Sequence, residues 1–449
     1  MSKLLVMLAV FLCLSSSVAY AEDTADRLDK LEKTVQDQAK TIEQQQQQID
    51  ALKKQQQPVP AQPDQSGIGK QEPSKTGGLF GSSALSNPNI SVILDTFYYT
   101  SDLSDAELAR QGIPGFTTQG LDQRNGFNLD SAELFIFAPV DPYANLYVNI
   151  PFTENGSSIE EAYAVTTSLP EGFQVKGGKF KSNFSRLDAQ HPHAWDFWDI
   201  ALPYRAFLGP EGLGGEKGIQ VTYLPTLPIY TQLGVEVLQG ENDLLFGADA
   251  QDGPHAFTVF VKSSIDASDN STVYFGPSVL FGKTKNSNIV AGVNPFLPAE
   301  FDGESALYGM EMVWKWKPDN VHGFILQSEY LLLTQRGDVA DPALPSEYHL
   351  IRKQDGFYIQ GIYRIHRWRF GVRYDVLDLG YDTFDQAGVD RNFGGKPHRE
   401  TVSAEFNPSE FTRLRLQLTH DLSDPSGKTN NEAILQFNFG IGAHAAHTF

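Results

Sequence analysis

The chain has 449 residues, of which 41% are hydrophobic, 12% aromatic and only 20% charged. Its 55 acidic residues outnumber its 35 Lys and Arg residues, and the net charge of −20 argues against a nucleic-acid binder, which needs a basic face. The aromatic content is too high for a wholly disordered chain. Long apolar runs, the mark of helical membrane proteins, occur only at the extreme N-terminus, so a large folded body of one or two domains is expected.

Residues 1–21 have the pattern of a secretory signal peptide. Lys3 supplies a basic n-region, the apolar run LLVMLAVFLCL follows, and Ala19 and Ala21 form an A-x-A cleavage site. The run is too short for a membrane-spanning anchor. Cleavage after Ala21 also removes Cys13, the only cysteine, so the stability of the exported chain does not rest on disulfides. Loss of Lys3 makes the mature net charge −21.

Residues 22–57 are polar but carry a sparse heptad repeat. One row is Leu28, Val35, Ile42 and Ile49, and the row three residues later is Leu31, Gln38, Gln45 and Leu52. The pattern predicts a short α-helical coiled coil, with a trimer as the expected oligomer, and its alternative is a single solvated helix. Residues 58–89 are rich in Pro, Gly and Ser without periodicity, which predicts a flexible linker.

From residue 90 onward the apolar pattern has a period of two. In residues 306–316, Tyr308 and Met310 share one face while Glu311 and Lys315 share the other, and later segments repeat this alternation. Strands of about ten residues with Trp and Tyr near their ends are typical of a transmembrane barrel rather than a soluble sandwich. Residues 90–449 are therefore predicted to form an all-β, antiparallel outer-membrane β-barrel, whose closure leaves no unpaired edge in lipid.

Short turns alternate with long loops along this segment, as they do in outer-membrane barrels. The breaks predict about 16 strands, near 90–100, 127–139, 143–153, 159–168, 173–181, 217–225, 228–239, 255–265, 271–282, 306–316, 321–333, 355–365, 367–377, 399–406, 410–421 and 431–449. The even number places both chain ends, and hence the coiled coil, on the periplasmic side. A barrel of this size is expected to enclose an aqueous channel rather than a packed core.

Three stretches resemble known outer-membrane proteins. The last strand, with Phe437 and Phe439 before the terminal Phe449, resembles the C-terminal signal of Gram-negative outer-membrane proteins, which implies recognition by the barrel assembly machinery. Residues 177–184, GGKFKSNF, are similar to a strand-end motif of the phosphate-selective porin O and P family. Residues 189–197, AQHPHAWDF, together with the ending GAHAAHTF, resemble outer-membrane proteins described as zinc-regulated TonB-dependent receptors.

The overall arrangement looks like a trimeric porin with an N-terminal periplasmic coiled coil. True TonB-dependent receptors carry a folded plug before a barrel of about 22 strands. This chain has a coiled coil and a linker in that place, and its barrel is too short. Active transport through a TonB box is therefore not expected.

The long loop at 182–216 follows the fifth predicted strand, and the porin resemblance implies that it folds into the barrel and narrows the pore. Its candidate constriction residues are Arg186, Asp188, Asp196, Asp199 and Arg205. Aromatic residues would wedge the loop against the wall and leave these charges facing the ion path. The alternative is a loop that lies outside or packs against a neighbour in the trimer.

The same loop holds candidate metal ligands. His191 and His193, with Asp196 and Asp199, supply the imidazole and carboxylate groups that suit zinc. Their spacing is not a specific signature, and the alternative is that the histidines only form hydrogen bonds within the loop. No resident cofactor is otherwise expected.

The polar faces of the predicted strands supply candidate pore-wall residues, which are Arg364, Arg367, Arg369, Arg373, Arg413, Arg415, Glu311, Glu329 and Glu405. Arginines opposite carboxylates would create a transverse field and favour anions locally, or would simply neutralise each other. The acidic loops raise the cation concentration near the mouth within about 8–10 Å. The two effects oppose each other, so the sequence leaves the sign of the selectivity open.

No G-x-S-x-G, H-E-x-x-H or P-loop motif is present, so an enzyme is not expected. The sequence predicts a porin in the Gram-negative outer membrane, in contact with its lipids, through which small hydrophilic solutes or ions diffuse past the 182–216 loop. One alternative is a zinc-related receptor or uptake protein. Another is a structural tether whose coiled coil binds a periplasmic partner.

Overall fold

The computed structural model describes residues 88–113, 115–247, 252–289, 298–386, 389–391, 396–424 and 428–442. The expected signal peptide with Ala19 and Ala21, the coiled coil over 22–57, the linker except for its last two residues, and Phe449 all lie outside the described residues.

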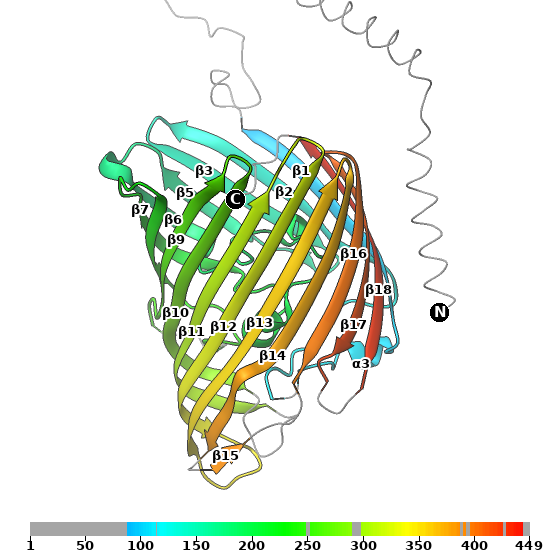
Figure 1. Cartoon of the computed structure of the whole chain (residues 1–449). Helices are drawn as coiled ribbons and strands as arrows, with labels where there is room; N and C mark the ends of the chain where they lie inside the picture. Colours follow the sequence, from blue (N-terminus) through cyan, green and yellow to red (C-terminus); the bar gives the residue numbers. More distant parts are fainter. Residues whose placement is uncertain are drawn as a thin grey trace, which may run out of the picture. The chain divides into compact units, whose positions relative to one another are not determined.

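The described residues form one antiparallel sheet that closes on itself (Figure 1). Sixteen long strands follow one another around the barrel, and β1 closes it by pairing with both β2 and β18. The long strands are β1 (Asn89–Ser101), β2 (Gly126–Asp141), β3 (Ala144–Thr153), β5 (Glu161–Thr166), β6 (Phe173–Lys181), β7 (Gly215–Tyr223), β8 (Tyr230–Leu238), β9 (Ala256–Ser268), β10 (Ser271–Ile289), β11 (Ala299–Trp316), β12 (His322–Ala340), β13 (Tyr348–Ile365), β14 (Trp368–Gln386), β16 (His398–Ser409), β17 (Thr412–Leu422) and β18 (Asn430–Gly442).

Two short strands and four helical turns complete the described elements. The strands are β4 (Gly156–Ser157), which extends the hairpin after β3, and β15 (Val389–Arg391), at the bottom of Figure 1. The helical turns are α3 (Asp105–Leu108), η2 (Pro170–Gly172), η3 (Pro192–Ala194) and α4 (Leu202–Phe207). Within the described residues, no helix has both the length and the apolar character needed to cross a membrane.

The predicted count of 16 strands and the closed antiparallel barrel are confirmed. Strands β10 to β14, however, have 18 or 19 residues each and extend past the predicted strand ends, for example past residue 282 in β10 and past residue 377 in β14. Their outward residues are polar and exposed, as Glu300, Asp302 and Asp338 are, whereas alternate residues such as Phe301, Val339 and Leu350 form a buried apolar cluster. The strand pairing therefore continues beyond the apolar stretch from which the sequence pattern was read.

Short turns and long connections gather at opposite ends of the barrel. The strand β13 passes into β14 through residues 366–367 alone, with His366 at a positive φ of 53°. At the other end, connections such as 102–125 and 182–214 are much longer. The first strand starts and the last strand ends at the short-turn end, since the strand number is even.

The two faces of the wall differ as a membrane-spanning barrel requires. On β11, Tyr308 and Met310 point outward with 48% and 50% of their surface exposed, whereas the neighbouring Glu311 points inward and is 2% exposed. Exposed apolar side chains recur on the outer faces of β1, β3, β8, β9, β14 and β16. An outward apolar face with charged groups inside is the pattern of a barrel in lipid.

The expectation of a barrel without a packed core is wrong where the long connections fold inward. Phe116 from the β1–β2 connection, Phe207 from α4 and Phe246 from the β8–β9 connection belong to one hydrophobic cluster with inward wall residues such as Leu280 and Leu331. Burial of these apolar side chains holds the connections in the lumen. The sequence pattern shows which strand residues point inward, but not which loops cover them.

Candidate functional site

The connection 182–214 lies inside the barrel, where Figure 1 shows it in green behind the wall strands. It leaves β6 and returns to β7, yet its side chains contact β12, β13, β14, β16 and β17 on another part of the wall. The element α4 packs on β13 and β14. The connection thus crosses the lumen instead of lying outside.

Arginines of the wall hold two of the three acidic residues predicted for the constriction. Asp196 forms an ion pair with Arg369. The Oδ2 atom of Asp199 lies 2.9 Å from Arg373 Nη2 and 2.9 Å from Arg399 Nη1. Burial raises the pKa of Asp199, but the charges of Arg373 and Arg399 and the hydrogen bonds from Gln417 and Arg373 lower it, and the pKa is about 2. The carboxylate is therefore ionised at neutral pH and anchors the connection.

Wall arginines also donate to the backbone of the connection. Arg413 Nη1 lies 2.7 Å from the carbonyl oxygen of His193, and Arg415 Nη2 lies 2.8 Å from that of Trp195. Arg399 Nη2 donates to Ile200 O at 2.9 Å. Hydrogen bonds from charged donors are stronger than neutral ones, so these contacts fix the path of the chain. Glu405 pairs with Arg415 at 2.8 Å and with Arg369 at 3.2 Å.

On β11 and β12, two buried carboxylates complete the attachment. Glu311 accepts the backbone N–H of Arg186 at 2.7 Å and forms an ion pair with Lys262. Glu329 accepts hydrogen bonds from the hydroxyls of Tyr204 and Tyr358. Glu311 and Glu329 therefore contact the inserted connection, together with Lys262, which sequence reasoning did not single out.

The other predicted constriction residues stabilise the connection itself. Asp188 accepts the N–H of Leu213 at 2.9 Å and the hydroxyl of Ser185 at 3.1 Å. Its burial raises the pKa to about 6 despite these bonds. Arg205 on α4 is buried and donates to the carbonyl oxygen of Gln111, in the β1–β2 connection, at 2.5 Å.

No hydrogen bond or ion pair joins Arg364 or Arg367 to the described connection 182–214, and both border a cavity at the short-turn end. This mouth cavity has a volume of about 650 Å³, and its lining includes both arginines. Its charged residues are Lys315, Lys317, Arg364, Arg367, Arg369, Arg413, Glu405 and Glu410. Basic groups outnumber acidic ones there by six to two.

A second cavity, which we name the inner cavity, has a volume of about 660 Å³ and borders the connection on the side of β3 to β10. Its charged residues other than histidine are Lys176, Lys181, Arg186, Lys262 and Glu161. Two atoms of the Arg186 guanidinium, Nε and Nη1, are buried without a hydrogen-bond partner. Basic groups again predominate.

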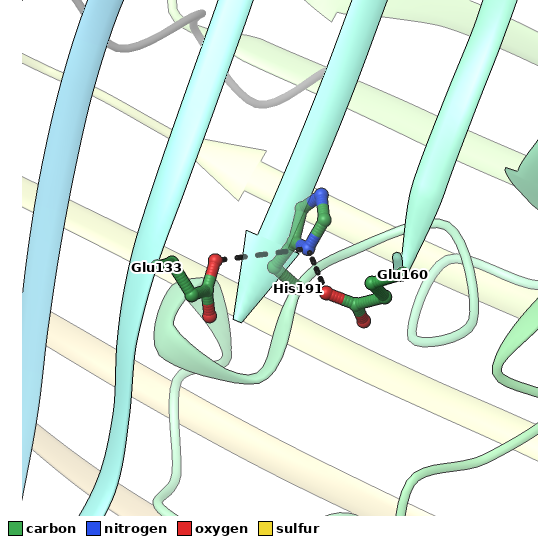
Figure 2. A group of neighbouring side chains, drawn as sticks. All are labelled: Glu133, Glu160 and His191. Carbon is green, nitrogen blue, oxygen red and sulfur yellow. Dashed lines mark hydrogen bonds and ion pairs between the residues drawn. The ribbon is translucent and has the colours of Figure 1, made fainter. Parts of the chain in front are cut away.

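Beside the inner cavity, His191 lies among three glutamates, as Figure 2 shows for Glu133 and Glu160. Its Nδ1 is 3.1 Å from Glu160 Oε2 and 4.0 Å from Glu133 Oε2, and its Nε2 is 2.8 Å from Glu161 Oε2. Burial lowers the pKa of His191, but the hydrogen bonds to Glu160 and Glu161 and the charge of Glu160 raise it, and the pKa is about 9. Without a bound cation the ring is therefore protonated at neutral pH.

The expected metal set of His191, His193, Asp196 and Asp199 is not brought together. The two aspartates pair with arginines, as described above, and His193 contacts only one carboxylate of the His191 cluster, with its Nδ1 3.0 Å from Glu133 Oε1. Sequence reasoning missed Glu133 and Glu160 because neither lies in the loop: Glu133 is on β2, and Glu160 directly precedes β5. No spacing within the loop could have indicated them.

The fold is that of outer-membrane channels. The outer membrane channel DcaP of Acinetobacter baumannii superposes with a TM-score of 0.53 at 16% identity, over 81% of this chain and 99% of that one. An anion-selective porin from Comamonas acidovorans gives a TM-score of 0.48 at 9% identity, over 79% of this chain and 100% of the porin. No family model matches the sequence.

One relative is much closer in sequence. A protein of Aquifex aeolicus (strain VF5), described as an uncharacterized protein, is 40% identical over 384 residues, which cover 81% of this chain and 80% of the relative. The chain belongs to the same protein family as this Aquifex protein.

Proposed function

We propose that the protein is an outer-membrane channel through which small hydrophilic solutes or ions diffuse passively, without a catalysed reaction. The observation that carries this proposal is the closed barrel with an exposed apolar outer face, a charged inner face and one long connection bound across its lumen. A bilayer is the environment that suits such an outer face, and closure leaves no strand edge unpaired in lipid. The fold shared with DcaP, an outer membrane channel, supports the same assignment.

The connection 182–214 is the proposed constriction. It narrows the lumen because its aromatic side chains pack against the wall and its aspartates bind wall arginines. The short turns face the periplasm in this assignment, and the long connections face outward, as in other barrels of this class. The two cavities then form the periplasmic half of the path.

We infer an anion preference within the lumen, although the mature chain is acidic overall. Basic residues predominate in both the mouth cavity and the inner cavity. Charges act over about 8–10 Å at physiological salt, so the groups that line the path outweigh acids on the outer surface. Of the charged groups that line the inner cavity, Arg186 belongs to the inserted connection itself, so it lies where the proposed path is narrowed.

Zinc uptake is a second candidate function, favoured by the His191 cluster on the wall of the inner cavity. It requires zinc to cross the barrel faster than other divalent cations, which a zinc-sensitive dye inside liposomes measures. The tether and the homotrimer stay predictions that rest on the heptad repeat of residues 22–57. Native mass measurement of the full mature chain tests the oligomer number.

Liposome swelling tests passive diffusion directly. We expect the folded mature protein to admit a pentose faster than a tetrasaccharide, because a constricted lumen filters by size. Liposomes without protein give the baseline. Equal rates for both sugars, or no swelling with protein whose fold is verified by circular dichroism, would overturn the channel assignment.

A further inference from the structure

The contacts around His191 conflict with one another. Its Nδ1 lies 2.9 Å from Asn149 Nδ2, which can only donate hydrogens, and 3.1 Å from Glu160 Oε2, which can only accept when ionised. If Nδ1 carries a proton, the contact with Asn149 brings two donors together. If Nδ1 carries a lone pair, the contact with Glu160 brings two acceptors together. Neither protonation state satisfies both neighbours.

Asn149 shows the same conflict from its own side. It lies on β3 and is 1% exposed, and its Nδ2 is 2.9 Å from His191 Nδ1, 3.0 Å from Glu160 Oε2 and 3.2 Å from Glu133 Oε2. The two carboxylates accept both amide hydrogens, so the protonated Nδ1 of His191 faces a second donor at 2.9 Å. Its Oδ1 is buried and has no hydrogen-bond partner. A buried acceptor without a partner costs roughly 1–3 kcal/mol, so this side chain is poorly satisfied as a purely hydrogen-bonding group.

We propose that Glu133, Asn149, Glu160 and His191 form a binding site for a divalent transition-metal cation. A half-turn of the Asn149 carboxamide would direct Oδ1 toward the same point as His191 Nδ1 and the two carboxylates. One nitrogen and three oxygens then surround a single position, a donor set that suits zinc and related cations. One ligand atom each from Glu133, Glu160 and His191 already lies within 4.8 Å of the other two.

The local charge supports a divalent ion. The three carboxylates of Glu133, Glu160 and Glu161 are opposed by Lys181, whose Nζ is 2.9 Å from Glu160 Oε1. With a neutral His191 the group carries a charge of −2, which a divalent cation would neutralise in this buried place. Glu161, 2.8 Å from His191 Nε2, would orient the ring as the hydrogen-bonded partner of a metal-bound histidine does.

A cation can reach the proposed site from the inner cavity, and its binding would fix the connection 182–214 to the wall. His191 and Glu161 line the inner cavity, which gives a hydrated cation access to the cluster. Glu133 and Asn149 come from wall strands, Glu160 precedes β5, and His191 belongs to the connection 182–214. A bound cation would therefore tie the inserted connection to the wall. This inference does not depend on the channel function, because binding is measured without flux.

The test uses the folded full mature chain, freed of metal with a chelator. We expect one Co²⁺ per chain with visible absorption bands, displacement of Co²⁺ by Zn²⁺, and a higher thermal unfolding temperature with Zn²⁺. Millimolar Ca²⁺ should not displace Co²⁺, because the proposed site includes an imidazole nitrogen. A folded chain that binds no Co²⁺, or that loses it to Ca²⁺, would overturn the proposal.

Variants locate the site. His191→Gln and Glu133→Gln should each weaken Zn²⁺ binding by at least about tenfold, in line with the effect of altering metal-site residues. The matched control is His349→Gln. His349 lies 3.1 Å from a single carboxylate, Asp338, and is on the outer surface, away from the cluster around His191. Asn149→Asp keeps the shape, adds a charged ligand, and should retain or strengthen binding. Equal Zn²⁺ affinity in His191→Gln and His349→Gln would contradict the assignment, and circular dichroism verifies each fold.

Discussion

At the scale of single residues, buried charges decide how the lumen is filled. Asp199 sits between Arg373 and Arg399, and Glu405 between Arg369 and Arg415. Removing one partner of a buried pair leaves an uncompensated charge, which costs more than the pair itself contributes. These pairs therefore make the inserted position of the connection specific, while its apolar side chains supply the burial energy.

Asp188 gives this attachment a dependence on pH. Its pKa is raised from 3.8 to about 6 by burial, so the folded state binds its proton more tightly than the unfolded state does. This contribution to the free energy of unfolding is fully present below about pH 4. It decreases by about 3 kcal/mol in total as the pH rises to about 6. Asp188→Asn removes the ionisable group and keeps the shape.

We therefore expect the difference in unfolding free energy between Asp188→Asn and the natural protein to grow between pH 4 and pH 6 and then level off. Urea unfolding in detergent at several pH values measures it. The control is Glu300→Gln, which alters an exposed carboxyl on β11. A difference that stays constant over this range would show that Asp188 does not titrate as described.

For the residues of the site, the sequence pattern predicted which side of the barrel wall a side chain faces. It did not predict which residue that side chain contacts. Alternation along the strands correctly pointed Arg373 and Glu311 inward, away from the exposed apolar face. It could not pair Arg373 with Asp199, 174 positions away, since such pairing depends on the path of the connection. Arg399 and Lys262 were missed for the same reason: their partners lie on an inserted loop rather than on neighbouring strands.

At the scale of elements, the fit of α4 against the wall depends on the absence of a side chain at Gly356. A Cβ there would lie 2.8 Å from Pro203 Cβ and 2.8 Å from Leu377 Cδ2. Carbon atoms do not approach so closely without a shift. The glycine therefore provides the space in which α4 packs on β13 and β14.

Gly356→Ala should displace α4 and destabilise the protein by about 1–3 kcal/mol, the usual cost of overpacking. Faster protease cleavage within 182–214 and a lower unfolding midpoint are the expected readouts. Gly361→Ala on the same strand is the matched control, because its Cβ would lie 3.5 Å from the nearest atom, Phe324 Cζ. Equal protease resistance of the two variants would argue against this tight contact.

The strands were the most predictable elements and the connections the least. The prediction for β6, residues 173–181, matches its bounds, because a turn with Pro170 and Gly172 limits it on one side. The ends of β10 to β14 were missed because pairing extends past the apolar alternation. A connection carries no periodicity that could tell whether it lies inside or outside the barrel.

At the scale of the whole barrel, the alternation of period two was sufficient to predict a closed sheet of 16 strands. Each strand repeats the same division between an apolar outer face and a polar inner face, so the signal accumulates along the chain. The packed cluster inside the barrel was not predicted, because its residues come from three separate connections. Solutes that cross the barrel must therefore pass the connection held there.

Single-channel current of the folded mature protein in a planar bilayer under a salt gradient tests whether ions pass this connection. We expect steady steps of current, and a reversal potential whose sign shows that anions pass more readily than cations. The double variant Asp196→Asn with Asp199→Asn should raise the conductance by roughly twofold, because it loosens the constriction and leaves more positive charge in the lumen. The control, Glu300→Gln with Glu347→Gln, removes two exposed carboxylates and should match the natural protein. If neither the natural protein nor the double variant carries current although both are verified as folded, solutes do not pass the connection and the protein is not an open channel.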